Sequence, residues 1–219
     1  TFVLKKNKKS KIKSLANANL DTVAIRFPNH RVIKSILKKL NFPLAMPSAN
    51  ISSNLSPISA LDVLDEFENK INIIIDGGKS KVGIESTVID LTGKPKILRP
   101  GIITLQNLKR FIGVNYARKN FKIKSPGLLR KHYSPGIPVI LNKKPNKTEH
   151  AFIIIGKKYK MQSNYFNLSK KADLKEAASN LYKTMRKIKK NGYKKIFVMK
   201  IPNIGPGIAI NDRLKRASK

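Results

Sequence analysis

The chain has 219 residues, 41% of them apolar and 26% charged, which is enough for two domains with a buried core. No apolar run approaches the roughly 18 residues needed to span a bilayer, so the composition excludes a protein anchored by transmembrane helices. Cysteine is absent, which excludes disulfides and thiolate metal sites. Because the chain starts in a strand-like pattern without a secretion signal, we expect a cytoplasmic protein whose N-terminus is truncated.

Basic residues dominate the charge. Lys and Arg outnumber Asp and Glu by 46 to 12, giving a net charge of +34. A folded chain with this charge attracts phosphates, so a nucleotide or an RNA partner is compatible with it. A composition rich in Lys, Asn and Ile throughout explains the excess equally well. Charge alone therefore leaves both explanations open.

The first half alternates strand and helix patterns. Strands are predicted over 1–4, 22–27, 71–75, 86–91 and 95–98, with a hairpin turn at 92–94 joining the last two. Helices are predicted from Pro28 to Leu40, over 61–67, and from the cap residue Thr104 to Gly113. Alternation of this kind predicts an α/β fold.

The second half begins after a stretch without periodicity. Residues 115–137 hold two Ser-Pro-Gly turns and are interpreted as an interdomain linker, after a first domain at 1–114 and before a second at 138–219. Buried strands are predicted over 138–141, 151–155 and 195–201. Between them, Asp173 and Glu176 form a capping-box-like start to a helix that Gly192 ends. This order predicts a small βαβ-type second domain.

Four polar segments stand at strand ends or between turns, where α/β sheets bind ligands. They are Ser48-Ala49-Asn50, Glu85-Ser86-Thr87, Arg99-Pro100-Gly101 and His132-Tyr133. Each also has a simpler interpretation, namely turn chemistry, a strand start with satisfied hydroxyls, a solvated arginine and a surface histidine. No P-loop or GxGxxG segment occurs, and three separated histidines without cysteine argue against a protein-held metal.

Taken together, these segments resemble the threonylcarbamoyl-AMP synthase family, the YrdC-like enzymes, in their long two-domain form. The motifs in the first half are Thr22-Val23-Ala24-Ile25-Arg26-Phe27-Pro28, Pro47-Ser48-Ala49-Asn50 with Ser56-Pro57, Glu85-Ser86-Thr87-Val88-Ile89-Asp90, and Leu98-Arg99-Pro100-Gly101. Those of the long form are Ser125-Pro126-Gly127, His132-Tyr133-Ser134-Pro135, and Ala209-Ile210-Asn211-Asp212-Arg213-Leu214 with Arg216-Ala217. Their order and spacing run through the whole chain.

The resemblance implies a YrdC-like twisted mixed sheet with helices, a small Rossmann-like α/β second domain, and a nucleotidyltransferase serving tRNA modification. L-threonine, bicarbonate and ATP with Mg²⁺ would give threonylcarbamoyl-adenylate and pyrophosphate, and separate machinery would transfer the carbamoyl group to tRNA. By similarity, threonine would contact Arg26, Met46 and Ser86. ATP would contact Thr22, Ser48, Asn50, Ser56, Arg99 and Tyr133, with His132 and Tyr133 as a lid. No side chain is assigned as nucleophile or acid–base catalyst, and none as a metal ligand.

Two departures from the family pattern accompany this resemblance. The opening strand and helix, with a lysine and arginine motif for ATP, would precede Thr1, so roughly 100 residues are expected to be missing and this fragment alone to be inactive. Ser53 and Ile58 stand where the family usually has glycine and threonine. The alternative is a non-catalytic RNA-binding module, supported by the +34 charge and by the resemblance of YrdC-like domains to a double-stranded RNA-binding surface. Recognition of single strands by stacking has little material here, because 7% of the residues are aromatic and none is Trp.

Overall fold

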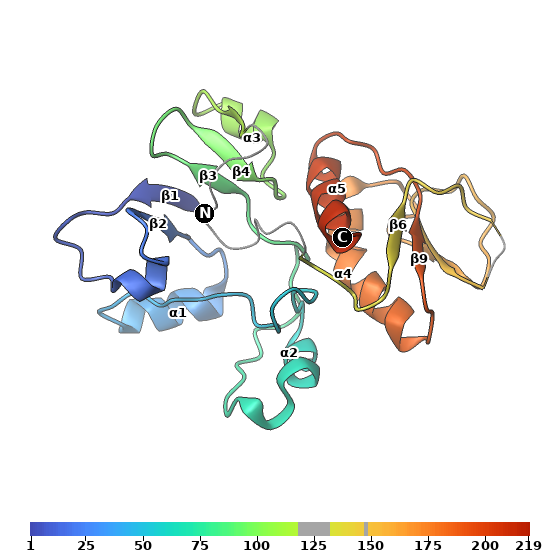
Figure 1. Cartoon of the computed structure of the whole chain (residues 1–219), viewed down its shortest axis with the longest axis horizontal. Helices are drawn as coiled ribbons and strands as arrows, with labels where there is room; N and C mark the ends of the chain where they lie inside the picture. The colour runs from blue at the N-terminus through green and yellow to red at the C-terminus, as the bar shows by residue number, and fades with distance from the viewer. Residues whose placement is uncertain (118–131, 147–148) are drawn as a thin grey trace.

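The computed structural model describes residues 1–117, 132–146 and 149–219, which form two α/β halves lying side by side (Figure 1). Each half is built on its own sheet. The expected turn at Ser125-Pro126-Gly127 lies outside the described residues, as does most of the expected linker.

The first half contains a mixed five-stranded sheet in the order β2-β1-β3-β4-β5. The strands are β1 (Phe2–Lys5), β2 (Thr22–Ile25), β3 (Val88–Asp90), β4 (Lys96–Arg99) and β5 (Asn115–Tyr116). β1 pairs antiparallel with β2 and parallel with β3, and β3 and β4 form the expected hairpin. Neighbouring residues along β3 belong to different apolar clusters, Val88 to one and Ile89 to the other, as the alternation of side chains in a strand requires.

The helices of the first half are α1 (Arg31–Lys39), α2 (Ala60–Phe67) and α3 (Leu105–Lys109), with short 3₁₀ turns η1 (Ser14–Asn17) and η2 (Glu68–Lys70). All three helices agree with the sequence prediction. Thr104 caps α3 in a reciprocal capping box with Asn107. The predicted strand at 71–75 was wrong, because the described residues offer it no ladder partner and Ile73 stays 80% exposed.

The second half contains a parallel four-stranded sheet in the order β6-β9-β7-β8. Its strands are β6 (Val139–Leu141), β7 (Ala151–Ile154), β8 (Tyr165–Asn167) and β9 (Ile196–Val198), and its helices are α4 (Leu174–Lys190) and α5 (Pro206–Ala217). The predicted βαβ arrangement is confirmed, whereas β8 and α5 were not predicted. Asp173 caps α4 as expected, but Glu176 accepts from Ser169 Oγ instead of closing a capping box. Among the helices described, none has the length and apolarity needed to cross a membrane.

The two halves share one apolar core. Leu55 and Ile84 of the first half belong to the same buried cluster as the inner faces of α4 and α5. Gly83 lies directly against α4, where an added Cβ would come within 2.4 Å of the Ser179 carbonyl oxygen. The junction between the halves is therefore closely packed, and the site described next lies beside it.

Candidate active site at the junction of the two halves

Several of the predicted site residues meet at one edge of the first sheet. β1 and β3 begin at this edge, and β2 and β4, which run antiparallel to them, end there. Arg26 follows β2, Ser86 comes just before β3, and Arg99 ends β4. Thr22 is the exception, because it begins β2 and pairs with Lys5 at the opposite edge.

Arg99 and Ser86 are in direct contact. The buried guanidinium donates from Nε and Nη2 to the Ser86 carbonyl oxygen at 3.1 and 3.0 Å, and from Nη2 to Ser86 Oγ at 3.3 Å. Thr1 Oγ1 lies 2.7 Å from the same hydroxyl. Burial lowers the pKa of Arg99, with Tyr133 opposing the shift and Arg213 adding to it, yet a guanidinium stays charged at neutral pH. The edge therefore carries a fixed positive charge beside two hydroxyls.

Arg26 and Met46 form the exposed part of the site. Arg26 Nη2 donates to the Met46 carbonyl oxygen at 3.3 Å, and both residues are exposed. The other donors of the Arg26 fork suit the two oxygens of a carboxylate. Sequence similarity assigned both residues to threonine, and the structure brings them together.

The loop from Ser48 to Ser56 lies between this edge and the second half. Ser48 is exposed, whereas Ser56 is buried and its Oγ donates to Glu85 Oε1 at 2.6 Å. Asn50 turns the loop by donating from Nδ2 to the carbonyl oxygens of Ile51 and Asn54, at 2.7 and 3.3 Å. The loop thus places Asn50 and Ser56 on the side of the second half.

His132 and Tyr133 enter the same junction. The Ser134 amide donates to the Ser53 carbonyl oxygen at 2.8 Å, which joins this segment to the loop. The Tyr133 ring is buried, contacts the His132 ring with centroids 4.1 Å apart, and stacks on Tyr182 of α4 at 5.8 Å. Burial raises the pKa of the Tyr133 phenol and lowers the pKa of the His132 imidazole, so both are neutral at pH 7.

Three buried polar atoms in this junction lack a hydrogen-bond partner among the described residues. They are Asn50 Oδ1, His132 Nδ1 and the Tyr133 hydroxyl, which lies near the Arg99 guanidinium. A buried polar atom without a partner costs about 1–3 kcal/mol, so each needs an explanation such as a bound ligand. All three belong to residues that the sequence motifs had selected.

Glu85 is the centre of a buried network that sequence reasoning did not assign. Its carboxylate accepts from Ser56, from the Tyr182 hydroxyl at 3.1 and 3.2 Å, and from Arg213 Nε at 2.8 Å. Burial alone would raise the pKa of Glu85, but Arg213, Ser56 and Arg99 outweigh it and lower the pKa. A signal was present in the sequence, because Arg213 falls at helical spacing on the apolar face of α5, where a charge needs a partner.

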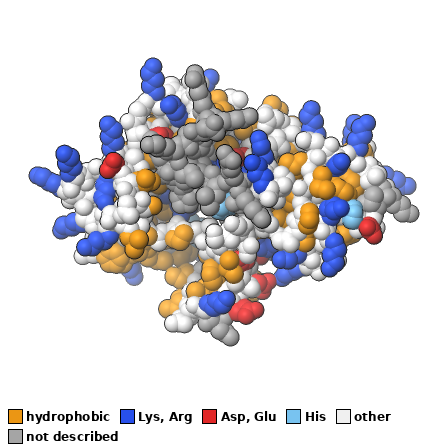
Figure 2. All heavy atoms as spheres, viewed as in Figure 1, with side chains coloured by type: hydrophobic (Ala, Val, Ile, Leu, Met, Phe, Trp, Pro, Cys, Tyr) orange, Lys and Arg blue, Asp and Glu red, His pale blue; other side chains and the backbone are white. Residues whose placement is uncertain are grey.

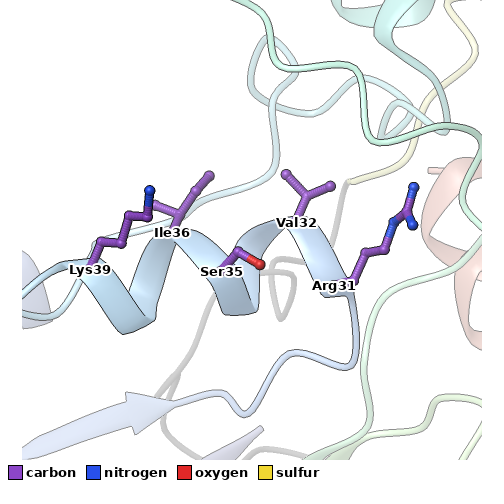
Figure 3. A pocket seen from close by; sticks show the side chains of 5 residues that line it. All are labelled: Arg31, Val32, Ser35, Ile36 and Lys39. Carbon is purple, nitrogen blue, oxygen red and sulfur yellow. The ribbon is translucent and has the colours of Figure 1, made fainter.

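Two surface hollows lie away from these site residues. The hollow in Figure 3 runs along helix α1 and is lined by Arg31, Val32, Ser35, Ile36 and Lys39. A second one is lined by β6, β7 and β9 residues together with Lys143 and Lys144. Among the described residues on the face in Figure 2, the Lys and Arg side chains are spread over both halves.

A mixed sheet that presents arginines and hydroxyls at its strand ends, packed against a second α/β half, is the arrangement of an α/β enzyme. Residues 1–101 match the family described as "Telomere recombination", and residues 103–219 match the "Threonylcarbamoyl-AMP synthase, C-terminal domain". The chain therefore belongs to the threonylcarbamoyl-AMP synthase family.

Individual relatives agree with this assignment. The threonylcarbamoyl-AMP synthase of Pyrococcus abyssi is 34% identical over all of this chain and 69% of its own length, and that of Bacillus subtilis is 32% identical over 92% and 64%. The chain thus spans about two thirds of these relatives. The crystal structure of P. abyssi Sua5 complexed with L-threonine superposes with a TM-score of 0.85 at 32% identity, covering 99% of this chain and 70% of that one. A variant of that protein, with a histidine and the following tyrosine replaced by alanine, gives 0.83.

Proposed function

We propose that the full-length protein is an L-threonylcarbamoyladenylate synthase, which converts L-threonine, bicarbonate and ATP into threonylcarbamoyl-AMP, pyrophosphate and water for tRNA threonylcarbamoyladenosine modification. Family membership over the whole chain supports the reaction class. The observation that carries the proposal is the set of buried polar atoms without partners among the described residues, on Asn50, His132 and Tyr133, together with the buried Arg99 beside Tyr133. Such a set of groups suits a ligand that is polar and anionic.

The threonine subsite is proposed at the exposed end of the edge. Arg26 pairs with the carboxylate of the amino acid, because a guanidinium fork matches two carboxylate oxygens. Ser86 offers a hydroxyl. The Met46 carbonyl oxygen accepts from Arg26 and so lies beside its guanidinium. The P. abyssi relative in its complex with L-threonine supports this choice of substrate.

The ATP subsite is proposed at the junction, on Ser48, Asn50, Ser56, Arg99 and Tyr133. Arg99 neutralises phosphate charge as the adenylate forms, since a preorganised cation in a buried site stabilises developing charge. Thr22 was assigned to this subsite by resemblance, and its position at the opposite edge gives it no contact with these residues.

No nucleophilic side chain is needed. Once threonine has been carboxylated, its carbamate oxygen attacks the α-phosphate and pyrophosphate leaves, so the residues here orient substrates and exclude water. His132 and Tyr133 form the proposed lid over the reactive anhydride. His132-Tyr133 is the one His-Tyr dipeptide in the sequence, and it matches in kind the pair replaced in the P. abyssi variant.

Mg²⁺ is proposed to enter with the triphosphate. The carboxylate nearest Ser86 and Arg99 is Glu85, and both of its oxygens accept hydrogen bonds from Ser56, Tyr182 and Arg213. Among the residues described, no cluster of three His, Asp or Glu side chains suits a metal. The ion would therefore be held mainly by phosphate oxygens and water.

The test uses the full-length protein with ATP and bicarbonate, and measures pyrophosphate release with and without L-threonine. A synthase releases pyrophosphate only when threonine is present. The RNA-binding alternative predicts no release and a salt-dependent affinity for double-stranded RNA. We further propose a cytoplasmic location, a linker spanning about 115–137 between domains at 1–114 and 138–219, and transfer of the product to tRNA by separate machinery.

A further inference from the structure

Arg213 of α5 holds the two segments that carry Ser86 and Arg99. It is fully buried, and its Nε donates to Glu85 Oε2 at 2.8 Å. Its Nη1 donates to the Pro100 carbonyl oxygen at 2.8 Å, and its Nη2 to the Glu85 carbonyl oxygen at 3.4 Å. One side chain from the second half therefore contacts the residue before Ser86 and the residue after Arg99.

The same guanidinium also contacts the proposed lid. Arg213 Cζ lies 5.4 Å from the centre of the Tyr133 ring, which also stacks on Tyr182, and the Tyr182 hydroxyl donates to Glu85. Tyr133 has a backbone φ of +63°, a left-handed conformation that costs a non-glycine residue about 1–2 kcal/mol. In this conformation the ring packs against Tyr182 of α4 and Arg213 of α5. The lid residue is thus oriented by the second half.

The Arg213 guanidinium stays charged although it is buried. Burial alone would lower the pKa of Arg213, but Glu85, Tyr182, Tyr133 and Asp212 outweigh it and raise the pKa. Asp212 Oδ2 accepts from Arg213 Nη1 at 2.9 Å, so the cation faces two carboxylates. A buried ion pair contributes little net stability compared with an apolar contact of equal size, so its presence calls for another role, such as fixing geometry.

We propose that Arg213 is a positioning residue for the synthase site: it orients Ser86, Arg99 and Tyr133 from the second half without touching substrate. This inference rests on the proposed function. It assigns the second domain a direct part in the geometry of the site. Positional errors of about 1 Å in such a site reduce turnover by roughly 100-fold, so a modest loosening of this contact has a measurable effect.

The test compares Arg213→Lys with two matched variants of the full-length protein. Lysine keeps the charge beside Glu85 but lacks the planar fork, so the two carbonyl oxygens lose their donors. Arg186→Lys removes a similar fork from the same junction, where Arg186 donates to the carbonyl oxygens of Leu55 and Ser56 at 2.7 and 3.0 Å. Lys215→Ala changes an exposed residue on the same helix as Arg213.

The measurements are kcat and KM for ATP and threonine, the melting temperature, and hydrogen–deuterium exchange over residues 84–88. We expect Arg213→Lys to lower kcat roughly tenfold or more, with smaller changes in KM, and to speed exchange over 84–88. Arg186→Lys should lower the melting temperature while leaving exchange over 84–88 close to wild type, and Lys215→Ala should resemble wild type in every measurement.

Two results would overturn the inference. One is wild-type kcat and exchange in Arg213→Lys. The other is faster exchange over 84–88 that follows the melting temperature equally in the Arg213 and Arg186 variants, which would show a general effect of loosening the junction. If wild-type protein makes no adenylate, the proposed function fails, and the exchange comparison alone still decides whether Arg213 holds residues 84–88.

Discussion

At the end of β4, the Arg99 guanidinium is held by the Ser86 carbonyl and hydroxyl oxygens and remains charged although it is buried. We predict that Arg99→Ala lowers product formation by roughly 100-fold or more, because a fixed cation at the reacting phosphate is lost. Circular dichroism should show a folded protein. Arg110→Ala, at an exposed position, serves as the control. Wild-type turnover in Arg99→Ala would remove this residue from the site.

Removal of the Tyr133 hydroxyl is expected to change nucleotide affinity without lowering the stability of the fold. Because this buried hydroxyl has no hydrogen-bond partner among the described residues, Tyr133→Phe should leave the melting temperature unchanged or raise it. If the hydroxyl contacts nucleotide, the same change should weaken ATP binding about 2- to 10-fold, the value of one hydrogen bond. Calorimetric titration with a non-hydrolysable ATP analogue checks both. Unchanged affinity together with lower stability would contradict the assignment.

Residue contacts could be predicted from sequence only where a motif holds both partners or a strand pairing brings them together. Ser86 comes just before the first strand of the β3–β4 hairpin, and Arg99 ends its second strand. Both therefore lie at the open end of the hairpin, and their contact follows from local structure. The Glu85–Arg213 pair joins residues 128 apart in different halves, and no periodicity connects them. What the sequence did contain was a charge at a core position of α5, which signals that a partner must exist without identifying it.

Elements with strong local signals were predicted, and those that depend on partners were not. α3 begins at a Thr104 capping box, and α4 has an Asp173 cap and a long apolar face, so both could be read directly. The run at 71–75 is as apolar as a buried strand, but an apolar run becomes a strand only beside another strand. β8 was missed because Tyr165–Asn167 stands in a polar stretch, without the apolar run that marks the other strands of this sheet.

Contact between the halves depends on close packing of the loop before β3 against α4. At Gly83, with φ +73°, an added Cβ would meet the Ser179 backbone at 2.4 Å. Gly83→Ala should therefore destabilise the protein by about 1–3 kcal/mol more than Gly78→Ala, which shares a positive φ of +83° but has open space around it. Urea unfolding measures both. Equal losses would show that backbone strain, and not the contact with α4, accounts for the effect.

In the whole molecule, one apolar cluster and the buried Glu85–Arg213 pair link the two halves, so the halves are expected to unfold together. The lowered pKa of Glu85 makes this junction sensitive to acid. A carboxylate with a depressed pKa in the folded state stabilises the protein above its ordinary range near pH 4, and this contribution is lost as the pH falls through the folded-state pKa.

Glu85→Gln tests this linkage. At pH 7 it should lower the free energy of unfolding by about 1–3 kcal/mol, because the buried Arg213 keeps Asp212 but loses the Glu85 carboxylate. The difference from wild type should narrow as the pH falls below the ordinary carboxyl range near pH 4, because Glu85, with its lowered pKa, becomes protonated in the wild type there. Denaturant titrations at several pH values give the measurement, with exposed Glu68→Gln as control. A difference that stays constant with pH would contradict the role of Glu85 ionisation.

The reaction itself is tested most directly by following the carbon of bicarbonate. The full-length protein is incubated with L-threonine, ATP and ¹³C-bicarbonate, and the nucleotide products are separated for mass spectrometry. We predict an adenylate that contains threonine and one labelled carbon, and its absence when threonine is omitted or when Arg99→Ala is used. Unlabelled AMP, or no new nucleotide at all, would contradict the account.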